Sequence, residues 1–574
     1  MKVIFPYLKP YRLQAIISPL FKLFEALLEL MIPLFIASMI DVGIAQHNNA
    51  HVLKMGAWVI LLAIVGLSFS LLAQYFAAYS AVGASCKLRS SLFAHIQSFS
   101  YKDLDKIGTS TLLNRMTADV NQVQTGINMT LRLLLRSPFV VAGAAIMAFT
   151  VDAKSSAIFL ATIPVLIIII YILMRLTLPR QKRVQAQLDN VTQSARENIT
   201  GVRVLRSFNL QQKEEHEFKE KTTLHSRLQM QTGHITTLMN PLTTLVVNIA
   251  LVILLWTGAI QVNTGVISTG AVIALVNYLS QILIELVKMA NLIVILTKSI
   301  ASAKRIQDIF SITPTQKQAS STVELRQTTS PIVDFSKVSF QYSNTSGYAL
   351  QDISFQANRG QSIGVIGGTA SGKSTLLQLI PRLYDATAGT VSVFGADVLQ
   401  QNISELRSNV GYVAQGAVPI KGSIRENLLW GNQQADDTLL WKALETAQAA
   451  EFVQKKSKGL DEELNSRGSN LSGGQKQRLM IARALVKQPA ILLLDDSASA
   501  LDYATDAALR KSIRTMENAP TVFIASQRAS AVRFCDIILV LEDGKLIASG
   551  KHENLVNECE LYRETYYLQY PKEG

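Results

Sequence analysis

The sequence predicts a multidomain membrane protein, in which an all-α domain of six transmembrane helices precedes an α/β domain. Three observations support this prediction. Of the 574 residues, 49% are hydrophobic, and the mean hydropathy is positive. Long apolar runs fill most of residues 13–298, whereas residues 332–574 have the mixed composition of a soluble domain. A glycine-rich turn in that second region lies between a strand pattern and a helix pattern.

Six segments are long and apolar enough to cross a bilayer, which takes about 20 residues in a helix. The clearest is the run from Ile158 to Met174, which carries no charged residue. Six such segments in succession argue against the alternative that they are core helices of a large soluble domain. The predicted spans cover residues 13–40, 55–82, 133–152, 156–178, 238–261 and 269–298.

The connections between the spans predict the orientation of the chain. Residues 41–51 and 262–270, which follow the first and fifth spans, contain no Lys or Arg. The two long connections, residues 83–132 and 175–235, are rich in both. The positive-inside rule therefore places the long connections and both termini in the cytoplasm. The net charge of +13 is assigned to these segments and not to a nucleic-acid-binding surface.

The long connections are expected to be helical extensions of the spans. Residues 184–208 contain no proline and space Val, Leu and Ile at helical intervals, with Gly201 as the single weak point. About fifty residues without secondary structure would be unusual in a compact domain. Long cytoplasmic helices joined by a short turn could press on another domain.

Ionisable residues within the predicted spans are the candidates for a substrate cavity. Glu25 and Glu29 lie one helical turn apart in the first span, and Glu285 and Lys288 lie in the last. Charged groups are costly in lipid, so they usually face a cavity or a partner. The sequence leaves two alternatives open: the carboxylates line a substrate cavity, or they pair within the helix bundle.

A polar stretch divides the chain into its two domains. Residues 313–331 have the Ser, Thr, Gln and Pro composition that is typical of a linker. We therefore predict a transmembrane domain over residues 1–312 and a second domain over residues 332–574.

The second domain contains a phosphate-binding pattern. Residues 361–380 predict a strand, a glycine-rich turn and a helix, and the turn matches the spacing G-x-x-x-x-G-K-S. In such a loop, backbone N–H groups surround phosphates, Lys373 neutralises their oxygens, and Ser374 can coordinate Mg²⁺. Asp495 ends an apolar strand pattern and can reach the water shell of the metal. The predicted loop comprises Gly367, Gly368, Thr369, Ala370, Ser371, Gly372, Lys373, Ser374 and Thr375.

A second motif precedes the strand that ends at Asp495. It reads LSGGQ and consists of Leu471, Ser472, Gly473, Gly474 and Gln475. This motif resembles the signature of ATP-binding cassette (ABC) proteins. The resemblance covers the whole chain, because six spans with two long cytoplasmic connections ahead of one cassette are similar to an ABC exporter half-transporter. It implies that two cassettes meet head to tail, each ATP lying between one subunit's phosphate loop and the other's signature.

The resemblance implies roles for further residues. Tyr342 resembles the aromatic residue that stacks on adenine, and Gln415 resembles the glutamine that senses Mg²⁺ and contacts the membrane domain. Mg²⁺ would then be held by Ser374, Gln415 and Asp495. The D-loop of the family would consist of Ser499, Ala500, Leu501 and Asp502.

Two residues depart from the family pattern, and both belong to the catalytic apparatus of one ATP site. Asp496 stands where the family has a glutamate that acts as general base or positions water. Its shorter side chain withdraws the carboxylate, and a misplacement of about 1 Å can cost about 100-fold in rate. Gln527 stands where the family has a histidine that contacts the γ-phosphate, and an amide cannot become cationic near neutral pH. We therefore expect this site to bind ATP but to hydrolyse it poorly.

An impaired site implies a dissimilar partner. The intact signature would complete an ATP site on a second half-transporter that supplies the glutamate and the histidine. This pattern resembles the degenerate-site subunit of heterodimeric bacterial multidrug ABC exporters. It implies a multi-pass protein of the bacterial plasma membrane, with the cassette and both termini in the cytoplasm.

The expected function is ATP-driven export of hydrophobic or amphipathic compounds, with turnover mainly at the partner's composite site. The expected ligands are ATP, Mg²⁺, membrane lipids and a small-molecule substrate, but no nucleic acid. Two alternatives stay open: export of a specific lipid, peptide or thiol, and a non-transporting, ATP-gated sensor or channel subunit.

Overall fold

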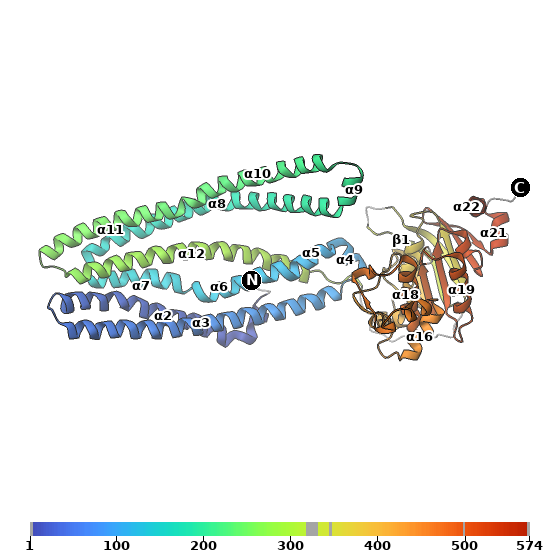
Figure 1. Cartoon of the computed structure of the whole chain (residues 1–574), viewed down its shortest axis with the longest axis horizontal. Coiled ribbons are helices and arrows are strands. Elements are labelled where there is room, and N and C mark those ends of the chain that lie inside the picture. Colours follow the sequence, from blue (N-terminus) through green and yellow to red (C-terminus); the bar gives the residue numbers. More distant parts are fainter. Residues whose placement is uncertain (1–3, 317–330, 344–346, 498–499, 571–574) are drawn as a thin grey trace. The chain divides into compact units, whose positions relative to one another are not determined.

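The computed structural model of the protein describes residues 4–316, 331–343, 347–497 and 500–570. They divide into two compact units (Figure 1). The first, the membrane unit, contains the chain as far as Gln97 and the segment Thr109–Ile312. The second, the cassette unit, contains Ser98–Gly108 and the chain from Thr313 onward. Most of the predicted linker, residues 317–330, lies outside the described residues.

Six helical stretches among the described residues are long and apolar enough to cross a membrane, which confirms the predicted number. They are Phe5–Ile44, Asn49–Gln97, Thr109–Val151, Ala153–Thr200, Gln211–Asn263 and Thr269–Phe310. The elements of the membrane unit are α1 (Phe5–Leu8), η1 (Lys9–Tyr11), α2 (Arg12–Ser38), η2 (Met39–Ile44), α3 (Asn49–Gln97), α5 (Thr109–Asn114), η3 (Arg115–Asp119), α6 (Val120–Leu133), α7 (Arg136–Val151), α8 (Ala153–Thr200), α9 (Val202–Ser207), α10 (Gln211–Thr237), α11 (Met239–Asn263) and α12 (Thr269–Phe310).

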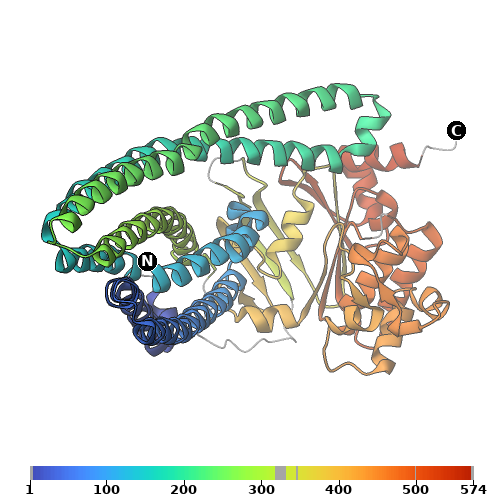
Figure 2. The same ribbon diagram turned by 60° about the vertical axis from the view of Figure 1, so that its left-hand side comes forward.

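Several of these helices are longer than a bilayer is thick. The 49 residues of α3 extend over about 73 Å, compared with about 30 Å of hydrocarbon. Helices α8 and α10 lie side by side and are joined by the short helix α9 (Figures 1 and 2). Helix α8 ends directly before Gly201, where the sequence predicts a weak point. The long connections are therefore helical extensions of the spans, as expected.

The outer and inner faces of the bundle differ in their environment. Ile64, Leu67 and Leu71 of α3 are 57%, 59% and 59% exposed. Water would solvate such an apolar face poorly, whereas lipid chains solvate it well. The inner faces of α2, α7, α8, α11 and α12 share one apolar core, in which Phe159 and Tyr278 are fully buried.

The cassette unit is an α/β structure with two larger sheets. One has the strand order β2-β1-β4-β5 and is antiparallel. The other has the order β12-β11-β3-β10-β9-β6, in which only β12 is antiparallel to its neighbour. The strands are β1 (Val333–Phe340), β2 (Leu350–Ala357), β3 (Ser362–Gly367), β4 (Ala388–Val393), β5 (Ala396–Asp397), β6 (Val410–Val413), β7 (Gly422–Ser423), β8 (Glu463–Leu464), β9 (Ile491–Asp495), β10 (Thr521–Ser526), β11 (Ile537–Glu542) and β12 (Lys545–Gly550).

Helices α13, α18 and α20 pack on the six-stranded sheet. The helices of the cassette unit are α4 (Tyr101–Ile107), α13 (Lys373–Leu379), α14 (Ile403–Ser408), α15 (Ile424–Leu429), α16 (Asp437–Thr446), α17 (Ala450–Gln454), η4 (Gly459–Asp461), η5 (Ser466–Gly468), α18 (Gly473–Val486), α19 (Tyr503–Arg514), α20 (Ala529–Val532), α21 (His552–Glu558) and α22 (Glu560–Gln569). Every residue of β9 and β10 is buried, as continuous apolar runs predict for parallel strands covered on both faces.

The parallel strands determine where the functional residues lie. β3 ends at Gly367, β9 at Asp495, and β10 directly before Gln527. Because parallel strands point the same way, their carboxyl ends meet at one edge of the sheet. In open α/β sheets this edge is where ligands bind.

Candidate nucleotide-binding site

A cavity of about 320 Å³ lies at this edge of the sheet. It brings together residues that the sequence predicts from five separate segments. It is lined by Tyr342, Ala349, Thr369, Ala370, Ser371, Gly372, Lys373, Ser374, Thr375, Gln415, Asp495, Asp496 and Gln527. The phosphate loop, the predicted metal residues and both departing residues therefore belong to one site.

Two glycines of the loop are required by its geometry. A Cβ atom at Gly367 would collide with the carbonyl oxygen of Leu541. Gly372 has a φ of +97°, and a Cβ atom there would lie 2.6 Å from the carbonyl oxygen of Ala349. Only glycine tolerates both the close approach and the left-handed backbone. The conformation of the loop is thus fixed by its sequence.

The Lys373 ammonium lies against its own loop. Its Nζ donates hydrogen bonds to the carbonyl oxygens of Gly367 at 2.9 Å and Gly368 at 2.5 Å. Burial lowers the pKa of Lys373, while the carboxylates of Asp496 and Asp495 oppose this shift. Phosphate oxygens are stronger acceptors than neutral carbonyls. The ammonium can therefore exchange its loop carbonyls for phosphate oxygens in the cavity.

Asp495 is held in position by two donors. Its carboxylate accepts hydrogen bonds from Ser374 Oγ at 2.8 Å and from the Tyr412 hydroxyl at 3.2 Å. Burial and the neighbouring Asp495 raise the pKa of Tyr412, so this hydroxyl stays protonated and donates. Hydroxyl, carboxylate and amide oxygens are ligands that Mg²⁺ accepts. Ser374, Asp495 and Gln415, which lines the same cavity, form a donor set that fits Mg²⁺.

The two departing residues follow β9 and β10. Asp496 has a φ of +47°, a left-handed conformation that aspartate tolerates better than most residues. Its backbone N–H donates to the carbonyl oxygen of Ala525 at 2.9 Å, which fixes the start of the side chain. Burial, followed by the Asp495 carboxylate, raises the pKa of Asp496. Gln527 is exposed and places a neutral amide at the cavity.

Tyr342 lies at the edge of the cavity. Its side chain is 43% exposed, and its hydroxyl lies 2.9 Å from Thr375 Oγ1 at the start of α13. Phe340 supports the ring edge-on at a centroid distance of 4.8 Å. Burial raises the pKa of Tyr342, so the phenol is neutral. A supported and partly exposed aromatic ring is a suitable platform for a planar base.

The signature begins helix α18. Ser472 caps the helix by accepting a hydrogen bond from the N–H of Gln475 at 3.3 Å, and Gln475 Oε1 accepts one from the N–H of Ser472 at 3.0 Å. This reciprocal pair is a capping box. Leu471 is buried, and Gly473 is the first residue of the helix.

The predicted D-loop lies next to the signature. Ser499 lies outside the described residues. A Cβ atom at Gly474 would lie 3.1 Å from the carbonyl oxygen of Ala500 and 3.6 Å from a side-chain carbon of Leu501. Asp502 caps α19 by accepting a hydrogen bond from the N–H of Thr505 at 2.9 Å. The glycines of the signature therefore leave room for this loop.

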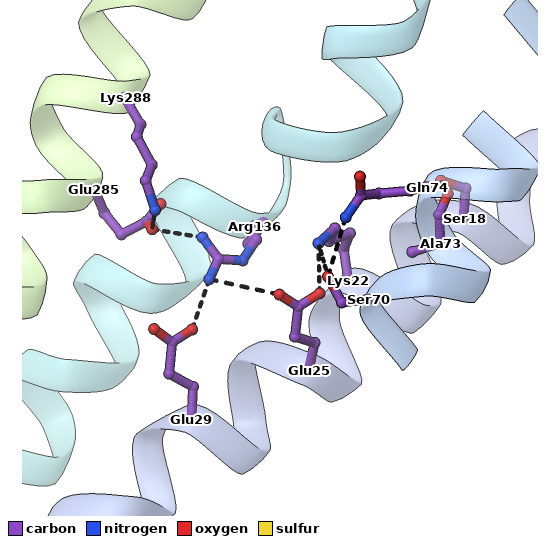
Figure 3. Close-up of polar contacts among 10 residues, drawn as sticks. All are labelled: Ser18, Lys22, Glu25, Glu29, Ser70, Ala73, Gln74, Arg136, Glu285 and Lys288. Atoms are coloured by element: carbon purple, nitrogen blue, oxygen red, sulfur yellow. Dashed lines mark hydrogen bonds and ion pairs between the residues drawn. The ribbon is translucent and has the colours of Figure 1, made fainter. Parts of the chain in front are cut away.

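The membrane carboxylates lie in a charged network centred on Arg136 of α7 (Figure 3). Arg136 donates to Glu285 of α12 at 2.5 Å and to Glu29 of α2 at 2.6 Å, and it lies 3.9 Å from Glu25. Glu25 also pairs with Lys22 at 2.5 Å, and Lys22 donates to Ser70 of α3. These contacts join four helices of the membrane unit.

The network continues on the side of Glu285. Lys288 and Ser137 both donate to this carboxylate, each at 2.8 Å. Among the residues drawn in Figure 3, three carboxylates thus face three cations. The Glu29 side chain is 38% exposed, compared with 4% for Glu285. The carboxylates pair within the bundle, and whether they also line a substrate cavity stays a prediction.

Sequence reasoning missed the partners of the predicted residues. Arg136 precedes the apolar part of the third span, and no pattern in the local sequence predicts its ion pair with Glu285. Tyr412 stands three residues before Gln415 in the segment VGYVAQ, so its proximity to a predicted metal residue was the available signal.

A phosphate loop, an LSGGQ helix and six membrane-crossing helices in one chain define an ATP-dependent membrane transporter. Residues 15–286 match the family model described as ABC transporter transmembrane region, and residues 350–499 match the model described as ABC transporter. The chain is 37% identical to the uncharacterized ABC transporter ATP-binding protein YfiB of Bacillus subtilis, covering 99% of this chain and 98% of that protein. This chain belongs to the ABC transporter family.

Other relatives span the full chain as well. The uncharacterized ABC transporter ATP-binding protein Rv1273c of Mycobacterium tuberculosis is 33% identical, over 97% of this chain and 96% of that protein. The putative multidrug export ATP-binding/permease protein YgaD of Bacillus subtilis is 29% identical, over 99% of each. A solved structure of a bacterial Atm1-family ABC exporter with ATP bound has a TM-score of 0.82 at 21% identity, over 99% of each chain.

These similarities establish an ABC exporter half-transporter, with a transmembrane domain and a nucleotide-binding domain in one chain. The fold is that of an exporter. The ATP-binding cassette implies that transport is coupled to ATP hydrolysis.

Proposed function

We propose that this chain is the degenerate-site subunit of a heterodimeric bacterial exporter of hydrophobic or amphipathic compounds. One observation carries the proposal: Asp496 and Gln527 line the same cavity as Lys373 and Asp495. Both departures therefore affect a single ATP site, while the residues that hold the nucleotide are intact. Such a site binds ATP and cleaves it slowly.

The residues of the cavity have different roles in binding the phosphates, holding Mg²⁺ and positioning water. The loop from Gly367 to Thr375 surrounds the phosphates with backbone N–H groups, and Lys373 compensates their charge. Ser374, Gln415 and Asp495 would hold Mg²⁺, which neutralises phosphate charge when bound. Asp496, shortened by one methylene and held by its left-handed backbone, falls short of a water that a glutamate would reach.

The intact signature supports a dissimilar partner. Two copies of this chain would build two impaired sites. A second half-transporter with a glutamate and a histidine would build one competent site opposite the signature of this chain. Hydrolysis at that composite site would then drive alternating access, and the impaired site would keep the cassettes in partial contact between turnovers.

Orientation and substrate class belong to the same proposal. The Lys and Arg residues of the long connections favour a cytoplasmic location for these helices, the cassette and both termini in the plasma membrane. The name of YgaD, a putative multidrug export protein, supports a hydrophobic or amphipathic substrate. Glu29, the more exposed carboxylate of the network, is our candidate for a residue that faces the substrate.

The test is transport by this chain co-expressed with a half-transporter that carries the catalytic glutamate and histidine. In inside-out vesicles, we expect ATP-dependent uptake of amphipathic dyes by the pair and none by this chain alone. Replacing the partner's catalytic glutamate with glutamine should abolish uptake, whereas Asp496→Glu in this chain should change it modestly. ATP turnover without uptake of any dye, lipid, peptide or thiol would favour the alternative of a sensor or channel.

A further inference from the structure

Within the cassette unit, Tyr384 lies between helix α4 and Tyr342, the residue proposed to stack on the base. Its ring meets the Tyr342 ring edge-on, with centroids 5.3 Å apart and planes at 84°. Its hydroxyl donates to the Asp105 carboxylate of α4 at 2.6 Å. Tyr384 itself is only 8% exposed, so its ring has little freedom to move independently of its neighbours. The Tyr384 side chain thus contacts both Tyr342 and helix α4.

The Tyr384 ring is fixed by further aromatic contacts. Phe340 lies 5.5 Å from it, and Tyr101 of α4 lies 6.0 Å from it, both measured between ring centroids. Burial, followed by the hydrogen bond to Asp105, raises the pKa of Tyr384, so the hydroxyl is protonated and donates. A change in the tilt of the Tyr342 ring would therefore alter its packing against the Tyr384 ring.

Helix α4 is anchored at its first turn by a second set of contacts. Asp103 closes a capping box with Ser100 and also accepts hydrogen bonds from Thr315, from N–H at 3.1 Å and from Oγ1 at 3.0 Å. Gln316 Nε2 donates to the carbonyl oxygen of Arg382 at 3.0 Å, two residues before Tyr384. The start of α4 is held in this way, and Asp105 in its middle is held by Tyr384.

Helix α4 is continuous in the chain with two membrane helices. It follows α3, which ends at Gln97, and precedes α5, which begins at Thr109. The covalent chain therefore links both ends of α4 to helices of the membrane unit. The Tyr342 hydroxyl in turn contacts Thr375, the last residue of the phosphate loop, at the start of α13.

We propose that Tyr384 is a positioning residue that transmits occupation of the base position at Tyr342 to helix α4 through its hydrogen bond to Asp105. The inference rests on the proposed role of Tyr342 in stacking on adenine. When a base stacks on Tyr342, its ring loses freedom to tilt, Tyr384 is fixed against it, and the bond to Asp105 tightens. Occupied and unoccupied sites then differ in how firmly α4 is held.

The test compares hydrogen–deuterium exchange of residues 101–108 in the full chain in lipid nanodiscs, with and without MgATP. In the wild type, MgATP should slow this exchange by about 3- to 10-fold, the effect of one strengthened hydrogen bond. Magnesium tripolyphosphate, which has no base, should not slow it. In Tyr384→Phe and in Asp105→Ala, the ATP effect should vanish while the Kd for ATP changes less than about 3-fold. The double variant should behave like either single variant.

Tyr562→Phe is the matched control, because Tyr562 is a buried tyrosine whose hydroxyl contacts His552 at 2.7 Å in another part of the cassette unit. It should keep the full ATP effect. Three results would overturn the inference: an unchanged ATP effect in Tyr384→Phe or Asp105→Ala, an equal loss in the control, or equal protection by tripolyphosphate.

The inference and the proposed function fail in different ways. If Tyr384→Phe does not fold, Asp105→Ala, on the helix surface, decides alone. A wild-type chain that does not bind ATP, or whose ATP affinity is unchanged in Tyr342→Ala, contradicts the proposed role of the site. A chain that binds ATP through Tyr342 without protection of α4 contradicts only the inference about Tyr384.

Discussion

Two groups of residues line the nucleotide cavity, and they differ in what fixes them. The phosphate-loop residues, Gly367 to Thr375, are fixed by backbone geometry, since a side chain at Gly367 or Gly372 would collide with neighbouring carbonyls. The departing residues, Asp496 and Gln527, act only through the reach and charge of their side chains. Binding therefore survives as long as the loop keeps its shape, whereas hydrolysis can be lost by two small substitutions. Under the proposed function, this site keeps the first property without the second.

The largest effect is expected where the phosphate-loop residues carry charge. Lys373→Ala should weaken ATP binding by about 100-fold or more, because a charge-assisted contact to the phosphates is lost. The measurement is equilibrium binding of a fluorescent ATP analogue to the full chain. Lys545→Ala, which removes an exposed lysine of β12, should leave binding unchanged. Equal affinities in both variants would contradict the assigned role of the loop.

The next effect tests the departing residues directly. In the chain alone, Asp496→Glu combined with Gln527→His should raise ATP turnover by about 10- to 100-fold, because the carboxylate regains about 1 Å of reach. The affinity for ATP should stay within about threefold, since the phosphate loop is unchanged. Steady-state phosphate release in nanodiscs measures this. Turnover that stays unchanged while ATP binds would show that the two side chains are not what limits hydrolysis.

A smaller effect is expected from a residue that supports the phosphate-loop side. Tyr412→Phe removes one of the donors to Asp495 and leaves Ser374. MgATP binding should weaken by about 10-fold, as for other residues that orient a metal ligand, while ATP binding in EDTA should not change. Titrations with and without Mg²⁺ distinguish the two. A loss of the same size in Tyr562→Phe would point to a general loss of packing.

The smallest effect concerns the free energy by which the ionised Asp496 carboxylate destabilises the folded state. Its pKa is raised above the ordinary value of 3.8, chiefly by burial, so the ionised form destabilises the folded state once the pH exceeds that value. Asp496→Asn removes this penalty and suits the left-handed backbone. It should raise the melting temperature of the nucleotide-free chain by a few degrees at pH 7, and the gain should shrink as the pH falls toward 3.8. A lower melting temperature at pH 7 would contradict this account.

The sequence could predict the features that depend on local patterns. The six membrane helices follow from apolar runs, the break of α8 from Gly201, and the phosphate loop from glycine spacing between a strand and a helix. The edge of the sheet where these residues meet also follows, because parallel strands place their carboxyl ends together.

The features that the sequence could not predict depend on contacts between residues that are distant in the chain. Arg136 and Glu285 are 149 positions apart, and Asp105 and Tyr384 are 279 apart. No local pattern indicates such pairs, since each residue alone is compatible with solvent or with many partners. The sequence could therefore state that Glu285 needs a partner in the membrane, but not that Arg136 is that partner.

The most direct test of the asymmetric site is ATP turnover by this chain alone, purified in lipid nanodiscs, measured together with ATP binding in the same sample. We expect saturable ATP binding at the Lys373 site, with turnover that rises only when the partner half-transporter is added. Fast hydrolysis by the isolated chain, coupled to movement of a substrate, would contradict the account.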